Sequence, residues 1–76
     1  MIVITLEGGL VQAVLSDDKT VRQQECVVVD YDADGSEDFV EDENGDECCP
    51  SRHKIGRLSK AQAKEVVKLT DEREAL

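Results

Sequence analysis

Residues 30–47 constrain this chain most, because they hold ten carboxylates and not one Lys or Arg. No cation occurs between Arg22 and Arg52 to neutralise them locally. Clustered carboxylates repel one another, so they are tolerated in water, around a hard metal ion, or against a basic partner. The ten residues are Asp30, Asp32, Asp34, Glu37, Asp38, Glu41, Asp42, Glu43, Asp46 and Glu47. This acidic run favours a function in binding rather than in chemistry.

Length and charge narrow the class of protein further. The chain has 76 residues, which suits one domain over residues 1–76, and a chain of this size buries about 60% of its unfolded surface. Its formal net charge of −9 argues against direct binding to nucleic acid or to an anionic membrane, since both attract Lys and Arg. Tyr31 and Phe39 are the only aromatic residues, so nucleotide bases would find no stacking platform.

We expect a cytoplasmic protein with reduced thiols. Residues 1–6 carry no basic region of the kind that starts an export signal. No apolar run approaches the roughly 20 residues that cross a bilayer. Three cysteines, Cys26, Cys48 and Cys49, are an odd number and do not form a disulfide framework.

The N-terminal segment predicts a β-hairpin. Residues 2–7 alternate and are rich in β-branched side chains, and Gly8-Gly9 suits a two-residue turn that requires positive φ. Residues 10–15 then return in a register that places Ile4 opposite Ala13. The apolar face expected from that register consists of Ile2, Ile4, Leu6, Val11, Ala13 and Leu15.

The rest of the chain predicts a third strand, a candidate fourth strand and a helix. Residues 26–29 favour a strand, Phe39-Val40 either a short fourth strand or an apolar plug that holds the acidic loop to the core, and Asn44-Gly45 a tight turn. Ser59 and Gln62 form a capping box that starts a C-terminal helix. Its apolar stripe, which could cover one sheet face, comprises Ala63, Val66, Val67, Leu69 and Thr70. The expected fold class is α+β, a small antiparallel sheet formed by the N-terminal hairpin and the third strand, with a C-terminal helix.

The acidic run also matches the loop of an EF-hand. Asp30, Asp32, Asp34 and Gly35 are followed by Glu41 at the twelfth position, and in that loop alternate oxygens surround one Ca²⁺. The flanking segments favour a strand and a turn where an EF-hand has helices. A calcium site formed by Asp30, Asp32, Asp34 and Glu41 is therefore the alternative to an acidic binding surface.

Cys48, Cys49 and His53, with Cys26 as a fourth residue, could be soft metal ligands. Either Cys48 or Cys49 could also be a nucleophile with His53 as its base. Two adjacent cysteines cannot easily place both sulfurs against one metal ion, which argues against a metal site. Nearby carboxylates raise the pKa of a thiol, which argues against a reactive nucleophile. We therefore interpret these residues as ordinary thiols and a surface histidine, and we expect no enzyme activity and no cofactor.

Cations follow the acidic run. They could fold back and neutralise part of it, although exposed ion pairs stabilise a fold by only about 0–1 kcal/mol each. These cations are Arg52, Lys54, Arg57, Lys60, Lys64 and Lys68.

Residues 4–14, Ser16-Asp17-Asp18 and residues 29–35 together resemble small acidic accessory proteins of proteobacterial phages, plasmids and integrative elements. The resemblance covers about residues 1–35. It implies a setting in which such proteins antagonise host defence, as anti-CRISPR proteins do when they occupy nucleic-acid-binding surfaces.

Three hypotheses follow. The first is a non-enzymatic inhibitor that presents the ten carboxylates to a basic protein surface, as a DNA mimic does, with a nucleic-acid-binding complex as the expected partner. The second is the calcium module. The third is a homodimer formed through Val3, Leu10 and Val14 on the second face of the hairpin.

Overall fold

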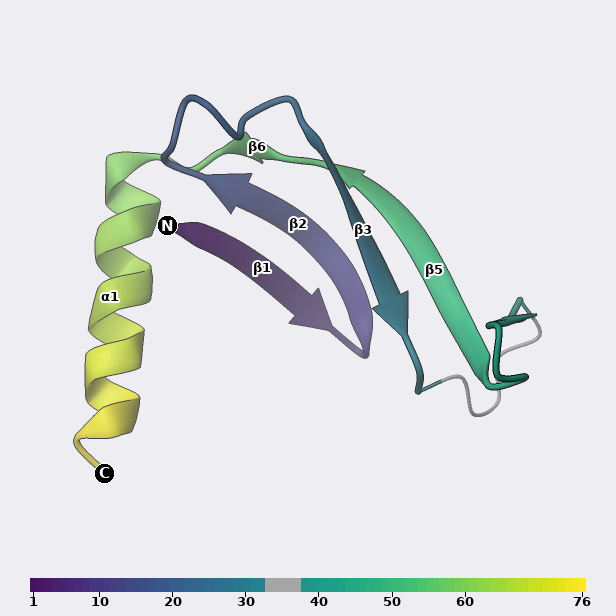
Figure 1. Ribbon diagram of the computed structural model, residues 1–76. Helices are drawn as coiled ribbons and strands as arrows, with labels where there is room; N and C mark the ends of the chain where they lie inside the picture. The colour runs from purple at the N-terminus through teal and green to yellow at the C-terminus, as the bar shows by residue number, and fades with distance from the viewer. Residues whose placement is uncertain (33–37) are drawn as a thin grey trace.

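The computed structural model describes residues 1–32 and 38–76 and has the expected α+β fold, with small sheets rich in antiparallel pairs and a C-terminal helix (Figure 1). The elements are β1 (Ile2–Glu7), β2 (Leu10–Ser16), β3 (Glu25–Asp30), β4 (Val40–Glu41), β5 (Glu47–Lys54), β6 (Gly56–Arg57) and α1 (Lys60–Glu74). One sheet has the strand order β1-β2-β6 and the other β3-β5-β4. The third strand was expected beside the hairpin in a single sheet, but β3 pairs with β5 instead and lies in the second sheet.

Strands β1 and β2 form the expected hairpin, but their register departs from the prediction. The pairs next to the Gly8-Gly9 turn are as expected. A bulge at Gln12 then shifts every later pair by one residue, so Ile4 lies opposite Val14 and not opposite Ala13. The prediction that Ala13 and Leu15 share a face with Ile2, Ile4 and Leu6 was therefore wrong, because Val14 and Ser16 take those positions.

Ser16 explains why the bulged register is stable. Its side chain is completely buried, its hydroxyl donates to the carbonyl of Met1 at 3.0 Å, and it accepts from the backbone N–H of Asp18 at 3.0 Å. The backbone N–H of Leu58 donates to the Ser16 carbonyl at 2.9 Å. The shift thus puts a serine in place of Leu15 where the chain start, β2 and β6 meet, and both the hydroxyl and the carbonyl of this serine have hydrogen-bond partners.

Strand β5 was not expected from the sequence. It pairs antiparallel with β3 along its length and with β4 at its start. The chain then continues through the buried Ile55 into β6, which pairs parallel with β2 in the other sheet. A single segment, residues 47–57, therefore joins the two sheets.

Helix α1 begins as predicted. The hydroxyl of Ser59 accepts from the backbone N–H of Gln62 at 3.1 Å, and the Gln62 side chain accepts from the backbone N–H of Ser59 at 2.9 Å. Its apolar stripe covers the sheet only in part. Ala63 and Val66 are half-buried, whereas the rest of the stripe is exposed. No helix in the described residues is long and apolar enough to cross a membrane.

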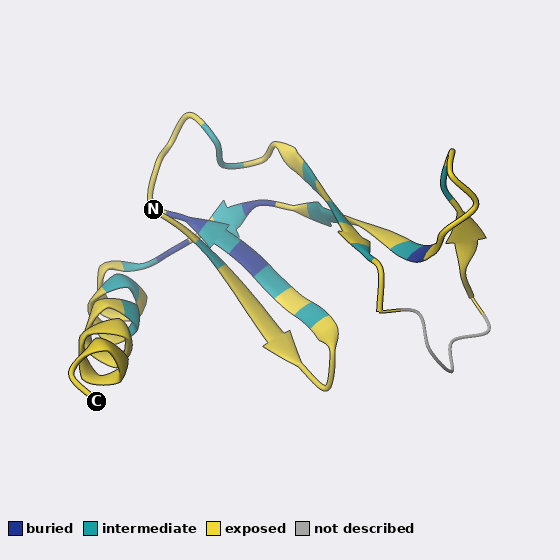
Figure 2. Cartoon of the chain, turned by 60° about the horizontal axis from the view of Figure 1, so that its bottom comes forward, coloured by how far each residue is buried: buried dark blue, intermediate teal, exposed yellow. Residues whose placement is uncertain are grey.

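The core is small. Figure 2 shows the buried positions along β2, at the β5–β6 junction and in the segment leading into α1, while most of the helix and the tip of the first hairpin are exposed. The buried apolar residues in the described part of the chain are Val14, Cys48, Ile55 and Leu58.

Candidate partner-binding site

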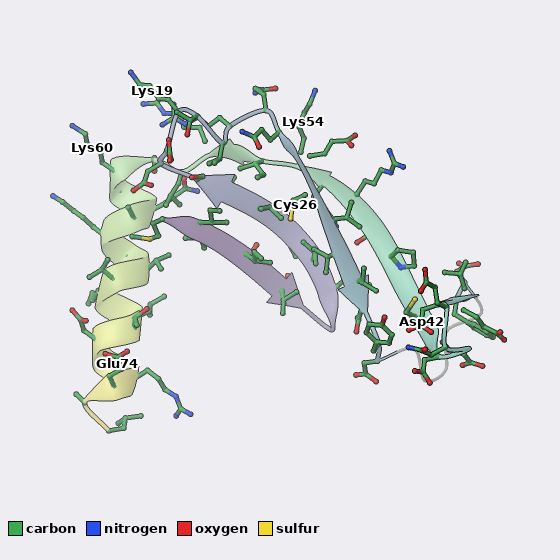
Figure 3. All side chains as sticks on the ribbon, in the orientation of Figure 1. Lys19, Cys26, Asp42, Lys54, Lys60 and Glu74 are labelled. Atoms are coloured by element: carbon green, nitrogen blue, oxygen red, sulfur yellow. The ribbon has the colours of Figure 1, made fainter. Side chains whose placement is uncertain are left out.

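The carboxylates gather at one end of the molecule. The turn between β4 and β5, at residues 42–46, forms this end together with residues 30–32 after β3. We call residues 30–32 and 38–47 the acidic end. Figure 3 labels Asp42 there, while Lys19, Lys54 and Lys60 lie away from it.

Asp42 organises this turn. One carboxylate oxygen accepts from the backbone N–H groups of Asn44 at 2.9 Å and Asp46 at 3.0 Å. The backbone N–H of Asp42 donates to the carbonyl of Asp46, and that of Gly45 donates to the carbonyl of Asp42. Gly45 has a φ of +81°, a conformation that glycine adopts without strain. Asp42 is therefore a structural residue of the turn as well as one of the ten acids.

Tyr31 ties the end of β3 to the same turn. Its hydroxyl donates to the second oxygen of the Asp42 carboxylate at 2.9 Å. The hydrogen bond from the Asp46 backbone, and then the one from Tyr31, lower the pKa of Asp42 below its usual value of 3.8. The same carboxylate raises the pKa of Tyr31. These contacts fix the position of the turn relative to β3.

The carboxylates around Asp42 point into solvent. Glu41 in β4 lies directly opposite Glu47 in β5, and both are exposed. Like charges at directly opposite positions of an antiparallel pair destabilise it. The exposed acids of the described part of the run are Asp32, Asp38, Glu41, Glu43, Asp46 and Glu47.

Cations do not neutralise this end in the described residues. The ion pairs among the described residues lie outside the acidic end. They join the N-terminal ammonium to Asp17 at 2.8 Å and Arg52 to Glu25 at 3.7 Å. Glu41, Glu43 and Glu47 have no Lys or Arg within ion-pair distance in this part of the chain. The basic residues 52–68 run from β5 into the far sheet and helix, so they do not fold back onto these three side chains.

The predicted calcium ligands are distributed as follows. Asp30, at the end of β3, is half-buried and accepts from the backbone N–H of Asp32 at 2.8 Å, and Glu41 lies in β4. Asp34 and Glu37 lie outside the described residues. Within residues 1–32 and 38–76, no three His, Cys, Asp or Glu side chains are grouped closely enough to hold a metal ion. Calcium binding by the full loop stays a prediction.

Cys48, Cys49 and His53 occupy separate positions on β5, and Cys26 lies on β3 opposite His53. Because neighbours in a strand point to opposite faces, Cys48 and Cys49 diverge. Cys48 is buried, and burial raises the pKa of its thiol, as does the Asp42 charge. The Cys49 thiol donates to the carbonyl of Asp38 at 3.4 Å. His53 shares a 2.7 Å hydrogen bond with the hydroxyl of Ser51.

An apolar cleft opens beside the acidic end. It has a volume of about 450 Å³ and lies between the tip of the β1–β2 hairpin and the β3–β5 pair. Leu10 and Val11 form one wall, Val29 and Pro50 the other, and Asp30 and Asp32 border it. Sequence reasoning missed this cleft because it depends on β5, whose charged and proline-containing sequence gives no strand signal.

The turn geometry makes a pH-dependent prediction. The folded-state pKa of Asp42 lies below its unfolded value, so its charge stabilises the fold above about pH 3.8, and this contribution is lost as the pH falls through the folded-state pKa. Asp42→Asn should therefore lower the free energy of unfolding at neutral pH but not in acid. Urea denaturation at several pH values measures the difference from wild type.

Glu43→Gln is the matched control for this prediction, because it removes one charge from the same turn and breaks no hydrogen bond of Asp42. It should leave stability unchanged or raise it at neutral pH. A deficit in Asp42→Asn that stays constant down to the lowest pH would contradict a role for the Asp42 charge.

Comparison of the chain with protein-family models, curated proteins and solved structures gave no match.

Proposed function

We propose that this chain is a non-enzymatic binding protein that presents its acidic end to a basic surface on another protein. The observation that carries the proposal is the β4–β5 hairpin, where Glu41 opposes Glu47 and Glu43 adds a third exposed charge without a cation nearby. This repulsion opposes folding. The cations of a basic partner would relieve this repulsion. The carboxylates would then serve binding rather than the stability of the fold.

The expected partner is a nucleic-acid-binding protein or complex. Its cationic groove is built to receive a regular row of phosphates, and carboxylates held on two paired strands supply a comparable row of negative charges. The Tyr31–Asp42 hydrogen bond holds this row in place before binding, which limits the entropy lost on association. The mobile-element resemblance of residues 1–35 suggests a host-defence complex, antagonised in the manner of an anti-CRISPR protein.

The cleft beside the acidic end would add selectivity. Charge alone attracts any basic protein, and the attraction weakens as salt rises. An apolar side chain of the partner could enter the cleft between Leu10 and Val29 while its cations meet Asp30 and Asp32. Such a combination resembles the apolar centre and polar rim of specific interfaces.

Capture from a bacterial lysate tests the proposal. The immobilised chain should retain a defined nucleic-acid-binding protein at moderate as well as low salt. Double-stranded DNA added as a competitor should release it, because DNA and the acidic end would occupy the same groove. Retention of only an assortment of basic proteins, all lost at moderate salt, would contradict the proposal and identify the acidic end as a solvated surface.

A further inference from the structure

The single chain exposes more surface than a folded protein of its size. Its accessible surface is 6209 Å², whereas a compact chain of 8.4 kDa exposes about 4600 Å². Its radius of gyration is 15.1 Å, against about 11 Å for a compact domain of this length. The excess of about 1600 Å² is within the range that each subunit buries in an obligate homodimer, roughly 1000–2500 Å².

Strand β1 leaves three large apolar side chains uncovered along one face. It is the outer strand of its sheet, so among the described strands only β2 pairs with it. Ile2, Ile4 and Leu6 alternate along one face of β1 and are 54%, 49% and 66% exposed. A groove of about 540 Å³ continues this surface between β1 and α1, where Val66 and Val67 line it.

The charge distribution allows a second copy of this chain at β1. Residues 1–24 and 51–76, which include β1 and α1, hold all nine cations and seven carboxylates. Residues 25–50 hold eleven carboxylates and no cation. Two copies can therefore approach through β1 with little net repulsion while their acidic ends stay apart.

We propose that β1 pairs antiparallel with β1 of a second copy about a two-fold axis, which makes the functional unit a homodimer. Residues opposite one another share a face, so a pairing centred on Ile4 places Ile4 opposite its equivalent and Ile2 opposite Leu6 of the second copy. The sheet β1-β2-β6 becomes continuous across the axis. The surface differs from the one expected from sequence, because Val14 is only 2% exposed and belongs to the core.

This inference goes beyond the proposed function and does not depend on it. A dimer displays two acidic ends, so a partner with two basic sites would bind with an avidity that one chain lacks. A chain with no basic partner would still dimerise.

Sedimentation equilibrium of the full chain tests the dimer. The wild type should have twice the mass of the 8.4 kDa chain. Ile4→Lys should weaken self-association at least about a hundredfold, because it places two uncompensated ammonium groups face to face in the interface. The matched control is Val27→Lys on the outer strand β3, where Val27 is 56% exposed. This control should remain dimeric.

A second measurement covers the case in which Ile4→Lys does not fold. The melting temperature of the wild type should rise with protein concentration, because dissociation accompanies unfolding of a dimer. A wild type of monomeric mass whose melting temperature is independent of concentration would overturn the proposal. So would a dimer that Val27→Lys dissociates and Ile4→Lys does not.

Discussion

Replacing Leu58 with alanine is expected to lower the free energy of unfolding by about 2–5 kcal/mol, the cost of truncating a buried leucine. Leu58 is 3% exposed and lies between β6 and α1, where it lines a cleft with Val3 and Leu15. Its backbone also donates to the carbonyl of Ser16. A domain of 76 residues has a total stability of only about 4–11 kcal/mol. The variant should therefore lose much of its stability, as the midpoint of urea denaturation would show.

Leu69→Ala is the matched control for Leu58→Ala. Leu69 lies on α1 and is 53% exposed, and alanine favours a helix at least as well as leucine does. Its free energy of unfolding should stay within about 0.5 kcal/mol of wild type. A loss in Leu58→Ala no larger than that in Leu69→Ala, measured at the same protein concentration, would contradict the expected contribution of Leu58 to stability.

Neutralising the exposed carboxylates of the β4–β5 hairpin should strongly weaken partner binding without harming the fold. The variant carries the substitutions Glu41→Gln, Glu43→Gln, Asp46→Asn and Glu47→Gln. It keeps Asp42, whose carboxylate holds the turn. Removing repulsion between Glu41 and Glu47 should leave the melting temperature unchanged or raise it. Affinity for the captured partner should fall at least about tenfold at low salt, and the remaining binding should depend less on salt.

The chain offers a control with the same change in net charge. Four carboxylates on α1 are replaced instead, as Glu65→Gln, Asp71→Asn, Glu72→Gln and Glu74→Gln. If binding depends on the position of the charges, this second variant should bind as wild type does. Equal losses of affinity would show that net charge alone attracts the partner. A clear fall in the melting temperature of the hairpin variant, with unchanged binding, would show that its carboxylates serve the fold.

Several elements follow from short stretches of sequence. The Gly8-Gly9 turn, the tight turn at Asn44-Gly45 and the capping box of Ser59 and Gln62 each depend on residues within a few positions of one another. Their hydrogen bonds and φ angles are set locally. The sequence could therefore predict the hairpin, the later turn and the start of α1, and with them the α+β fold class.

The register of the hairpin could not be predicted from a short stretch of sequence. Alternation in residues 2–15 fits more than one pairing, and the bulge at Gln12 is selected by the burial of Val14 and Ser16. That burial depends on Met1 and Leu58, which are remote in sequence from one another. Likewise, β5 forms because β3, β4 and the chain continuing into β6 hold it, despite Pro50 within it.

The candidate site, like the fold, could be predicted from the sequence only in part. The sequence by itself determined that the net negative charge would gather in residues 30–47, since that follows from composition alone. Only the tertiary structure decided which of these acids accept hydrogen bonds within the fold and which lie opposite another charge. Asp42 accepts the hydrogen bonds of the turn, and Glu41 lies opposite Glu47. The cations of residues 52–68 lie along β5, β6 and α1, away from the turn. The physical reason is that charge is a property of each residue, whereas its partners depend on contacts between distant segments.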